Sequence, residues 1–329
     1  MPALAPGAAT ATAVVWTVSS PSPSMLAKLR LSLCQAAKHA TAVAAAALVV
    51  FHDGSLQCAS LSDASGLPCM SIAVASVELM PQRRRCELAP PSLRASSVQL
   101  VEVDSAADAE LNVMRSAIVS RRSHRVDLTD EKAFRGTNYR FVVFDRLALR
   151  LGLSVVLYLD CDAFLLASAA PLFEMSSQAA LVVARRTWQG VSPISRMEFS
   201  PRHLAATARL WGFSNLSSQA FNDGVMLVNA REYCRAGIWN RMLDVARFHE
   251  FNQSLFNAAG NQPIQQIAAA GHVLLASSLW NCRDDYVNRV RGHVHNAVEG
   301  GPLHSRALAA LTRTGCHIMH VRSEASAWG

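Results

Sequence analysis

One segment of this 329-residue chain, VVLYLDCDAFLL at residues 155–166, restricts the fold more than any other. It is an apolar run of strand length that ends in two aspartates, Asp160 and Asp162, separated by one residue. Because side chains alternate along a strand, we expect both carboxylates to point to the same side at its carboxyl end, where open α/β sheets bind ligands. Two carboxylates this close repel each other unless a cation lies between them. The pair therefore predicts a hard divalent metal that binds phosphate oxygens.

Further apolar runs alternate with segments of helical character. This order predicts an α/β fold with a mainly parallel, doubly wound, Rossmann-like sheet flanked by helices. Besides the segment above, the expected strands span residues 12–20, 46–51, 97–103, 181–184 and 225–228. The expected helices span residues 25–39, 108–125 and 139–151. Residues 56–94 are punctuated by Pro and Ser, so no element is predicted there.

The composition, with 51% hydrophobic and 17% charged residues, is that of a globular protein. The longest apolar run, at residues 40–51, is shorter than the roughly 18 residues of a membrane helix and is read as a buried strand. No membrane span is therefore expected in this chain. No basic region precedes the first apolar segment, so no signal peptide or anchor is visible. This slightly favours the cytoplasm, with the Golgi lumen left open if the N-terminus is incomplete.

The net charge and the cysteines limit the kinds of molecule and metal that this chain is expected to bind. The net charge is +7, with basic clusters at residues 83–85 and 121–125. Aromatic residues are not interleaved with these clusters, which argues against nucleic acid and fits attraction of a small anionic substrate. The eight cysteines form no CxxC pairs, so we expect reduced, mostly buried thiols rather than a zinc site or a disulfide framework.

The strand with its two acids is compatible with three interpretations. It occurs in nucleotide-sugar transferases, where the aspartates hold a metal and a diphosphate. It also occurs in haloacid-dehalogenase-like phosphatases, in which Asp160 would be the nucleophile. In the third interpretation both acids merely cap the turn that follows. A phosphatase needs a downstream lysine, and the chain has none after Lys132.

Later motifs favour the first interpretation. In chain order they are PLF at 171–173, FNDGVMLVN at 221–229, NQ at 261–262, WN at 280–281 and GCHIMHVRSEASAW at 315–328. This set resembles the family 8 glycosyltransferases, which include glycogenin and bacterial lipopolysaccharide galactosyltransferases. Their pattern is YLDxDxxxxxxxxxLF, FNxGVxxxN, DQ, WN and HFxGxxKPW. The resemblance covers residues 141–328 well, and the first hundred residues only through the order of elements.

The resemblance implies a GT-A fold and retaining transfer of a hexosyl or pentosyl group from a UDP-sugar to an acceptor hydroxyl, with Mn²⁺ or another divalent cation. It further implies one domain over residues 1–329, with a nucleotide-binding half at 1–125 and a half for metal, donor and acceptor at 126–329. The acceptor class (glycan, protein, lipid or polyol) stays open, and so does a homodimer.

The resemblance also assigns roles to single residues. The metal ligands would be Asp160, Asp162 and His320, a set that suits Mn²⁺ better than Mg²⁺, and Asp160 would also lie near the donor. The catalytic group would comprise Asn222, Gln262 and Asn261. The other donor-binding residues would be Arg140, Thr17, Ser19 and Gly224. Three alternatives remain: His320 as a strand histidine whose hydrogen bonds are satisfied within the protein, Arg140 as a surface helix residue, and residues 221–229 as a β-turn that leads into a core strand.

The chain departs from the family pattern at several positions. The aspartate of DQ is Asn261, and the glycine, lysine and proline of the last motif are Ser323, Ser326 and Ala327. Losing a cation where charge develops typically costs about 3 kcal/mol, roughly a hundredfold in rate. Arg322 is a nearby replacement for that lysine. These departures predict a slow enzyme, a different donor, or a degenerate protein that binds nucleotide sugar without turnover.

Overall fold

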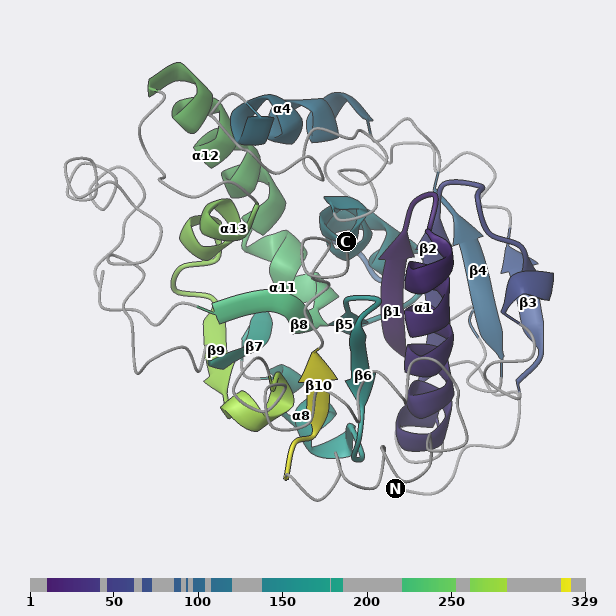
Figure 1. Cartoon of the computed structure of the whole chain (residues 1–329). Helices are drawn as coiled ribbons and strands as arrows, with labels where there is room; N and C mark the ends of the chain where they lie inside the picture. Colours follow the sequence, from purple (N-terminus) through teal and green to yellow (C-terminus); the bar gives the residue numbers. More distant parts are fainter. Residues whose placement is uncertain are drawn as a thin grey trace.

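A central eight-stranded sheet organises the molecule, with the strand order β3-β4-β2-β1-β5-β8-β7-β9 (Figure 1). The computed structural model describes residues 11–41, 46–61, 67–72, 86–89, 93, 97–103, 108–119, 138–177, 179–185, 221–252, 261–282 and 315–320. The strands are β1 Thr12–Val18, β2 Ala47–His52, β3 Cys69–Ile72, β4 Val98–Glu102, β5 Val155–Leu159, β7 Leu181–Arg185, β8 Phe221–Asn229 and β9 Val273–Ala276. Only β8 runs against the others, because it pairs antiparallel with both β5 and β7. The predicted mainly parallel α/β fold is therefore confirmed.

Both faces of the sheet are buried, and β1 shows how one strand serves two cores. Ala13 and Val15 face one core, whereas Val14, Trp16 and Val18 face the other. A strand covered on both faces has no polar alternation, which is why these strands read as continuous apolar runs.

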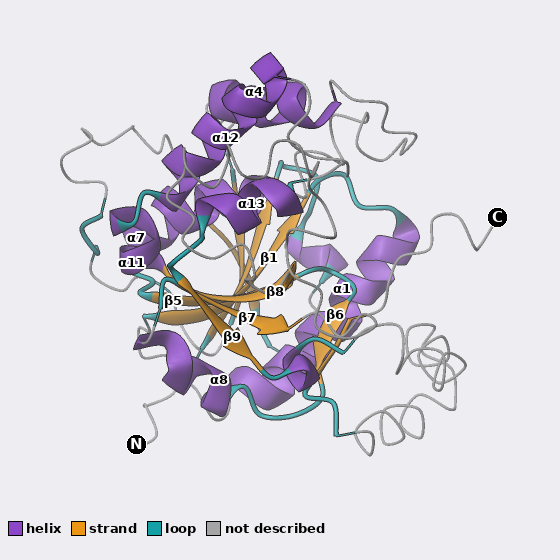
Figure 2. Ribbon diagram, turned by 90° about the vertical axis from the view of Figure 1, so that its left-hand side faces the viewer, coloured by secondary structure: helices purple, strands orange, loops and turns teal. Residues whose placement is uncertain are grey.

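Helices cover both faces (Figure 2). The core that contains Ala13 packs against α4, α12, α13 and the helix around η5, and the other core packs against α1. The helices are α1 Pro23–Ala36, η1 Ala37–Thr41, η2 Cys58–Ser60, α4 Asp108–Val119, η5 Val143–Leu147, α7 Ala148–Arg150, α8 Ala170–Glu174, η6 Met175–Ser177, α11 Ala230–Arg235, α12 Ile238–Asn252, α13 Gln262–Ala268 and η7 Ser278–Trp280. None of the described helices is long and apolar enough for a membrane span.

Element boundaries differ from the predictions for local reasons. The first helix begins two residues early, at Pro23, because the Ser22 hydroxyl accepts a hydrogen bond from the Met25 amide and Pro occupies the first turn. Residues 221–229 form one nine-residue strand, so the interpretation as a β-turn was wrong. The polar residues at the start of β8 hid its true length. The end of the predicted helix at 120–125 lies outside the described residues.

Two three-residue strands that the sequence did not predict form a separate ribbon. β6 (Ala163–Leu165) pairs antiparallel with β10 (Ile318–His320), so that His320 lies opposite Ala163. Ala163 directly follows Asp162. The two aspartates lie in the turn between β5, which ends at Leu159, and β6, so the expectation that alternation along a strand aligns them was wrong. The ribbon brings His320 to this turn.

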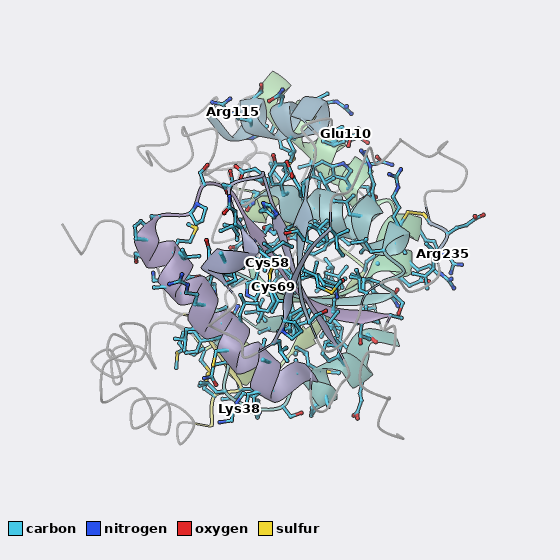
Figure 3. All side chains as sticks on the ribbon, turned by 90° about the vertical axis from the view of Figure 1, so that its right-hand side faces the viewer. Lys38, Cys58, Cys69, Glu110, Arg115 and Arg235 are labelled. Carbon is cyan, nitrogen blue, oxygen red and sulfur yellow. A yellow bond between two sulfur atoms is a disulfide. The ribbon has the colours of Figure 1, made fainter. Side chains whose placement is uncertain are left out.

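Six cysteines are paired, which corrects the expectation of reduced thiols. The disulfides join Cys58 to Cys69 (Figure 3), Cys86 to Cys234 and Cys282 to Cys316. The partners are 11, 148 and 34 residues apart, and only the folded chain brings their Cα atoms to within 5.4–6.1 Å. In the part of the chain that the structure describes, Cys34 and Cys161 remain free.

Candidate metal and donor site

The candidate site lies at the carboxyl edge of the sheet, where β5 ends. Because β8 is antiparallel to β5, its first residues reach the same edge at which β5 finishes. The Asp160 amide donates to the Gly224 carbonyl over 2.8 Å, which fixes the two segments side by side. The reversed direction of β8 thus brings the residues of the FNDG motif next to the two aspartates.

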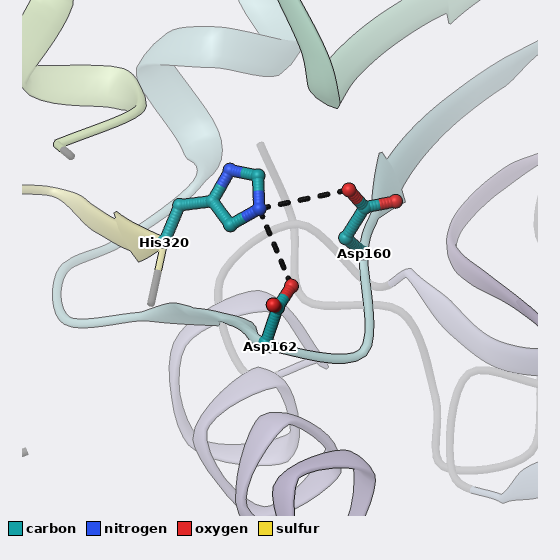
Figure 4. Close-up of side chains that lie close together, drawn as sticks. All are labelled: Asp160, Asp162 and His320. Atoms are coloured by element: carbon teal, nitrogen blue, oxygen red, sulfur yellow. Dashed lines mark ion pairs between the residues drawn. The ribbon is translucent and has the colours of Figure 1, made fainter. Parts of the chain in front are cut away.

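Asp160, Asp162 and His320 converge, as expected for a common ligand (Figure 4). The His320 Nε2 atom lies 3.3 Å from Asp162 Oδ1 and 3.6 Å from Asp160 Oδ2. One candidate ligand atom from each residue lies within 4.8 Å of the others. Burial raises the pKa of the Asp160 carboxyl, and Arg140 and His320 offset this only in part. Burial acts in the same direction on Asp162, but the charge and hydrogen bond of His320 hold the pKa of Asp162 below its ordinary value.

The hydrogen bonding around His320 suits a metal ligand. Its Nδ1 atom lies 3.0 Å from Asn281 Oδ1, and the Asn281 amide nitrogen donates to Asn222 Oδ1 over 3.0 Å. Because this orientation makes Asn281 Oδ1 an acceptor, His320 Nδ1 is the nitrogen that donates to it. His320 Nε2, which faces the two carboxylates, is then the ring nitrogen left to bind a cation, as in metal-bound histidines whose other ring nitrogen donates a hydrogen bond. Two carboxylate oxygens and one imidazole nitrogen are a donor set that fits a divalent cation such as Mn²⁺.

Gly224 allows this convergence. A Cβ atom at this position would lie 2.1 Å from His320 Cε1 and 2.5 Å from Asp160 Oδ2. The sequence predicted close approach of the backbone to the donor. The observed close approach is to two candidate metal ligands, so the glycine makes room for the site itself.

On the histidine side, an imidazole and three amide side chains form what we call the amide relay: His320, Asn281, Asn222 and Gln262. Asn222 Oδ1 also accepts from the Gly224 amide over 3.1 Å, and its Nδ2 donates to Gln262 Oε1 over 3.4 Å. Gln262 Nε2 in turn donates to the Phe221 carbonyl over 2.6 Å. The Asn222 amide is therefore engaged within the protein, and its contact with sugar hydroxyls stays a prediction. Asn281 was not predicted as a site residue, although its WN motif was noted.

On the aspartate side, Arg140 anchors a set of contacts that we call the arginine network. Arg140 is 1% exposed, so the alternative of a surface arginine was wrong. Burial alone would lower the pKa of Arg140, but its acidic neighbours and Tyr158 raise it, so the guanidinium is charged. Its nitrogens contact Asp160 Oδ1 at 3.2 Å, Asp223 Oδ2 at 2.6 Å, the Tyr158 hydroxyl at 3.4 Å and Asn261 Oδ1 at 3.4 Å.

Two members of this network were missed by sequence reasoning. The Tyr158 hydroxyl donates to Asp160 Oδ1 over 2.7 Å, and burial raises the pKa of Tyr158 well above its ordinary value. Tyr158 was read only as part of an apolar strand. Asp223 occupies the variable position of FNxG, so no pattern marked it. An acid at a buried strand start is the one signal that would have drawn attention to it.

Thr17 and Ser19 lie at the end of β1 on the same edge of the sheet. Thr17 Oγ1 is 3.5 Å from the Tyr158 hydroxyl. Ser19 donates to Asp53 Oδ2 over 2.5 Å, and although burial opposes it, this and neighbouring hydrogen bonds lower the pKa of Asp53. Binding of uracil or ribose by Thr17 and Ser19 stays a prediction. Arg322, Ser323, Ser326 and Ala327 of the last motif lie outside the described residues.

Known proteins resemble this chain in sequence pattern and in fold. The family model described as glycosyl transferase family 8 matches residues 90–301. No curated protein matches the chain. The galactosyltransferase LgtC, solved with donor and acceptor sugar analogues, is 15% identical with a TM-score of 0.52, covering 97% of this chain and 92% of that chain. The bifunctional glycosyltransferase WbbM, in its apo form, is 12% identical with a TM-score of 0.53, covering 97% of this chain and 47% of that chain. At such identities the likeness shows the fold, and the predicted GT-A fold is confirmed.

Proposed function

Because the chain belongs to glycosyl transferase family 8, whose model matches residues 90–301 of its 329, we propose that this glycosyltransferase uses a UDP-sugar donor and a divalent cation, Mn²⁺ first. We propose transfer of a hexosyl or pentosyl group to an acceptor hydroxyl with retention of anomeric configuration. The family match replaces the phosphatase alternative. We also propose that residues 1–329 act as one catalytic unit, with the nucleotide bound mainly by residues 1–125.

The convergence of Asp160, Asp162 and His320 is the observation that carries this proposal. The charges around it support the same conclusion. Two of these residues are acids, and the neighbouring Asp223 and Arg140 add one charge of each sign. With His320 neutral the group carries a net charge of −2, which one divalent cation balances. Bound there, Mn²⁺ supplies a Lewis acid for the donor diphosphate.

The protein's own groups would position the donor at this edge. Arg140 holds Asp160 through Oδ1 and so leaves Oδ2 directed at His320. The acceptor hydroxyl attacks the anomeric carbon from the face that UDP leaves. The new glycosidic C–O bond forms as the C–O bond to UDP breaks, and the hydroxyl proton passes to a phosphate oxygen of the departing UDP. We assign no described residue as a protein nucleophile.

The test is UDP release from a panel of UDP-sugars, hydrolysis included, with and without MnCl₂. We expect turnover of at least one donor by the wild type and a loss of roughly a hundredfold or more in Asp160→Asn, because the cation loses a charged ligand. Asp244→Asn is the matched control, since this exposed acid forms only a surface pair with Arg247. Equal rates in the wild type and Asp160→Asn would remove the metal-site assignment. If UDP binds but no UDP is released from any UDP-sugar, the result favours a degenerate protein that binds nucleotide sugar without turnover.

We further propose that the chain matures in an oxidising compartment, in place of the slight preference for the cytoplasm. Three disulfides in one chain are typical of secreted, luminal or periplasmic proteins and rare in the cytosol. Peptide mapping of the native protein without reductant is expected to recover the three cross-linked pairs. Complete alkylation of all eight cysteines would contradict this proposal.

A further inference from the structure

Asp223 is a buried acid that none of the predicted roles includes. It is 6% exposed, and its Oδ2 atom accepts from Arg140 Nη2 over 2.6 Å. The other terminal nitrogen of Arg140 donates to Asp160 Oδ1 over 3.2 Å and to the Asp223 carbonyl over 3.3 Å. One guanidinium therefore joins Asp223 to a candidate metal ligand.

Position 261 faces the same guanidinium nitrogen. Asn261 Oδ1 lies 3.4 Å from Arg140 Nη2, and its Nδ2 donates to Asn138 Oδ1 over 2.9 Å. Two side chains on different elements thus converge on one arginine nitrogen, and only Asp223 carries a charge. The NQ motif has an amide where the family pattern has a carboxylate, whereas the variable position of FNxG has a carboxylate here.

We propose that Asp223 is a positioning residue of the metal site, which supplies from β8 the carboxylate that position 261 lacks. Asp223 neutralises Arg140 and fixes its guanidinium, so that Arg140 holds Asp160 by one oxygen and leaves the other directed at the cation. This inference rests on the proposed metal-dependent function.

Loss of the Asp223 charge has two consequences that act in the same direction. The guanidinium, buried among the same residues, would keep Asp160 as its acidic partner among the described residues and would compete with the cation for that carboxylate. Its positive charge would also act on the cation without compensation, in surroundings where screening by water is weak. Both effects weaken cation binding. If the ion pair between Arg140 and Asp223 only stabilised the fold, its loss would lower the free energy of unfolding. The affinity of the folded protein for the cation would stay unchanged.

The experiment measures Mn²⁺ binding by calorimetry on full-length protein stripped with a chelator, alongside the melting temperature. The variants are Asp223→Asn, the exchange Asp223→Asn with Asn261→Asp, and the control Asp244→Asn. We expect the Mn²⁺ dissociation constant of Asp223→Asn to rise by about tenfold, the lower end of the effect of losing an outer-layer partner of a metal ligand, because Asp223 reaches Asp160 only through Arg140. We expect the exchange to recover most of that loss, since its carboxylate faces the same arginine nitrogen. UDP-sugar turnover should follow the same order.

Every outcome of this experiment either supports or contradicts the proposed role of Asp223. Wild-type affinity in Asp223→Asn, with the wild type itself binding Mn²⁺ and releasing UDP, overturns the role of Asp223 and leaves the proposed function intact. A wild type that binds no Mn²⁺ overturns both. If Asp223→Asn does not fold, the exchange variant decides: folding with near-wild-type Mn²⁺ affinity supports the proposal. Failure of the exchange to fold, or to recover affinity, overturns it.

Discussion

The two sides of the candidate metal site are held by different kinds of interaction. Asp160, on the aspartate side, is held by the arginine network, in which a guanidinium is surrounded by two carboxylates and a phenol. His320, on the other side, is held by the amide relay, in which each group is uncharged when the imidazole is neutral. The arginine network fixes the charge around Asp160. The amide relay fixes which atom donates and which accepts in each hydrogen bond on the His320 side.

The difference predicts different sensitivities. Removing one partner of a buried ion pair typically costs about 3–5 kcal/mol of unfolding free energy, because a charge is left uncompensated. Leaving one neutral donor or acceptor unsatisfied costs about 1–3 kcal/mol. The aspartate side should therefore respond to changes of charge that preserve shape. The histidine side should respond to changes that reverse or remove a donor or acceptor.

Gly224→Ala is expected to have the largest effect, because it disturbs both sides at once. The added methyl group would overlap His320 Cε1 and Asp160 Oδ2 at 2.1 and 2.5 Å, so the two ligands must separate. We expect UDP-sugar turnover to fall by roughly a hundredfold or more, the effect expected for losing a metal-binding side chain. Calorimetry should then detect no Mn²⁺ binding.

Gly237→Ala is the control, since a Cβ there meets no atom within 4 Å although its φ of +61° favours glycine. It should lower the melting temperature and leave Mn²⁺ affinity unchanged. If Gly224→Ala binds Mn²⁺ as the wild type does, the two sides are not packed against each other as described.

Asn281→Leu tests the amide relay alone. It removes the acceptor for His320 Nδ1 and one donor to Asn222 Oδ1, so the imidazole loses its fixed orientation. We expect the Mn²⁺ dissociation constant to rise by about tenfold to a hundredfold. Asn281→Asp keeps the acceptor for the imidazole and should weaken binding less. The relay has no such role if Leu and Asp at this position give the same affinity as Asn.

Replacing Cys282 and Cys316 with Ser should have the smallest effect on the site. This disulfide joins the segment that carries Asn281 to the residues before β10. Its loss should lower the free energy of unfolding by about 2–4 kcal/mol. Backbone hydrogen bonds still connect Cys282 to Ile318 and His320, so Mn²⁺ affinity should fall less than in Asn281→Leu.

Chemical denaturation and calorimetry of the same samples measure both quantities. Removal of the Cys58–Cys69 pair is the matched control, which should change stability only. A larger loss of Mn²⁺ affinity than in Asn281→Leu would show that the disulfide, rather than the relay, holds the histidine side.

Local sequence determined much of the fold and one half of the site. The apolar runs of β1, β2 and β5 indicated buried strands. The two acids after β5 share a site because they are neighbours along the chain. His320 was found through a motif, since nothing near it in sequence marks a ligand. In each case the signal was short-range: an apolar run of strand length, or residues a few positions apart.

Only the tertiary structure decided which distant segments meet. The antiparallel course of β8 brings Asp223 and Gly224 to Asp160, and the β6–β10 ribbon brings His320 to Asp162. The disulfide pairs, the burial of Arg140 and the positions of Asn281 and Asn261 follow from the same packing. A periodic pattern records which face of an element is buried. Which elements pack together depends on burial and hydrogen bonding summed over the whole chain. No single segment of the sequence contains that information.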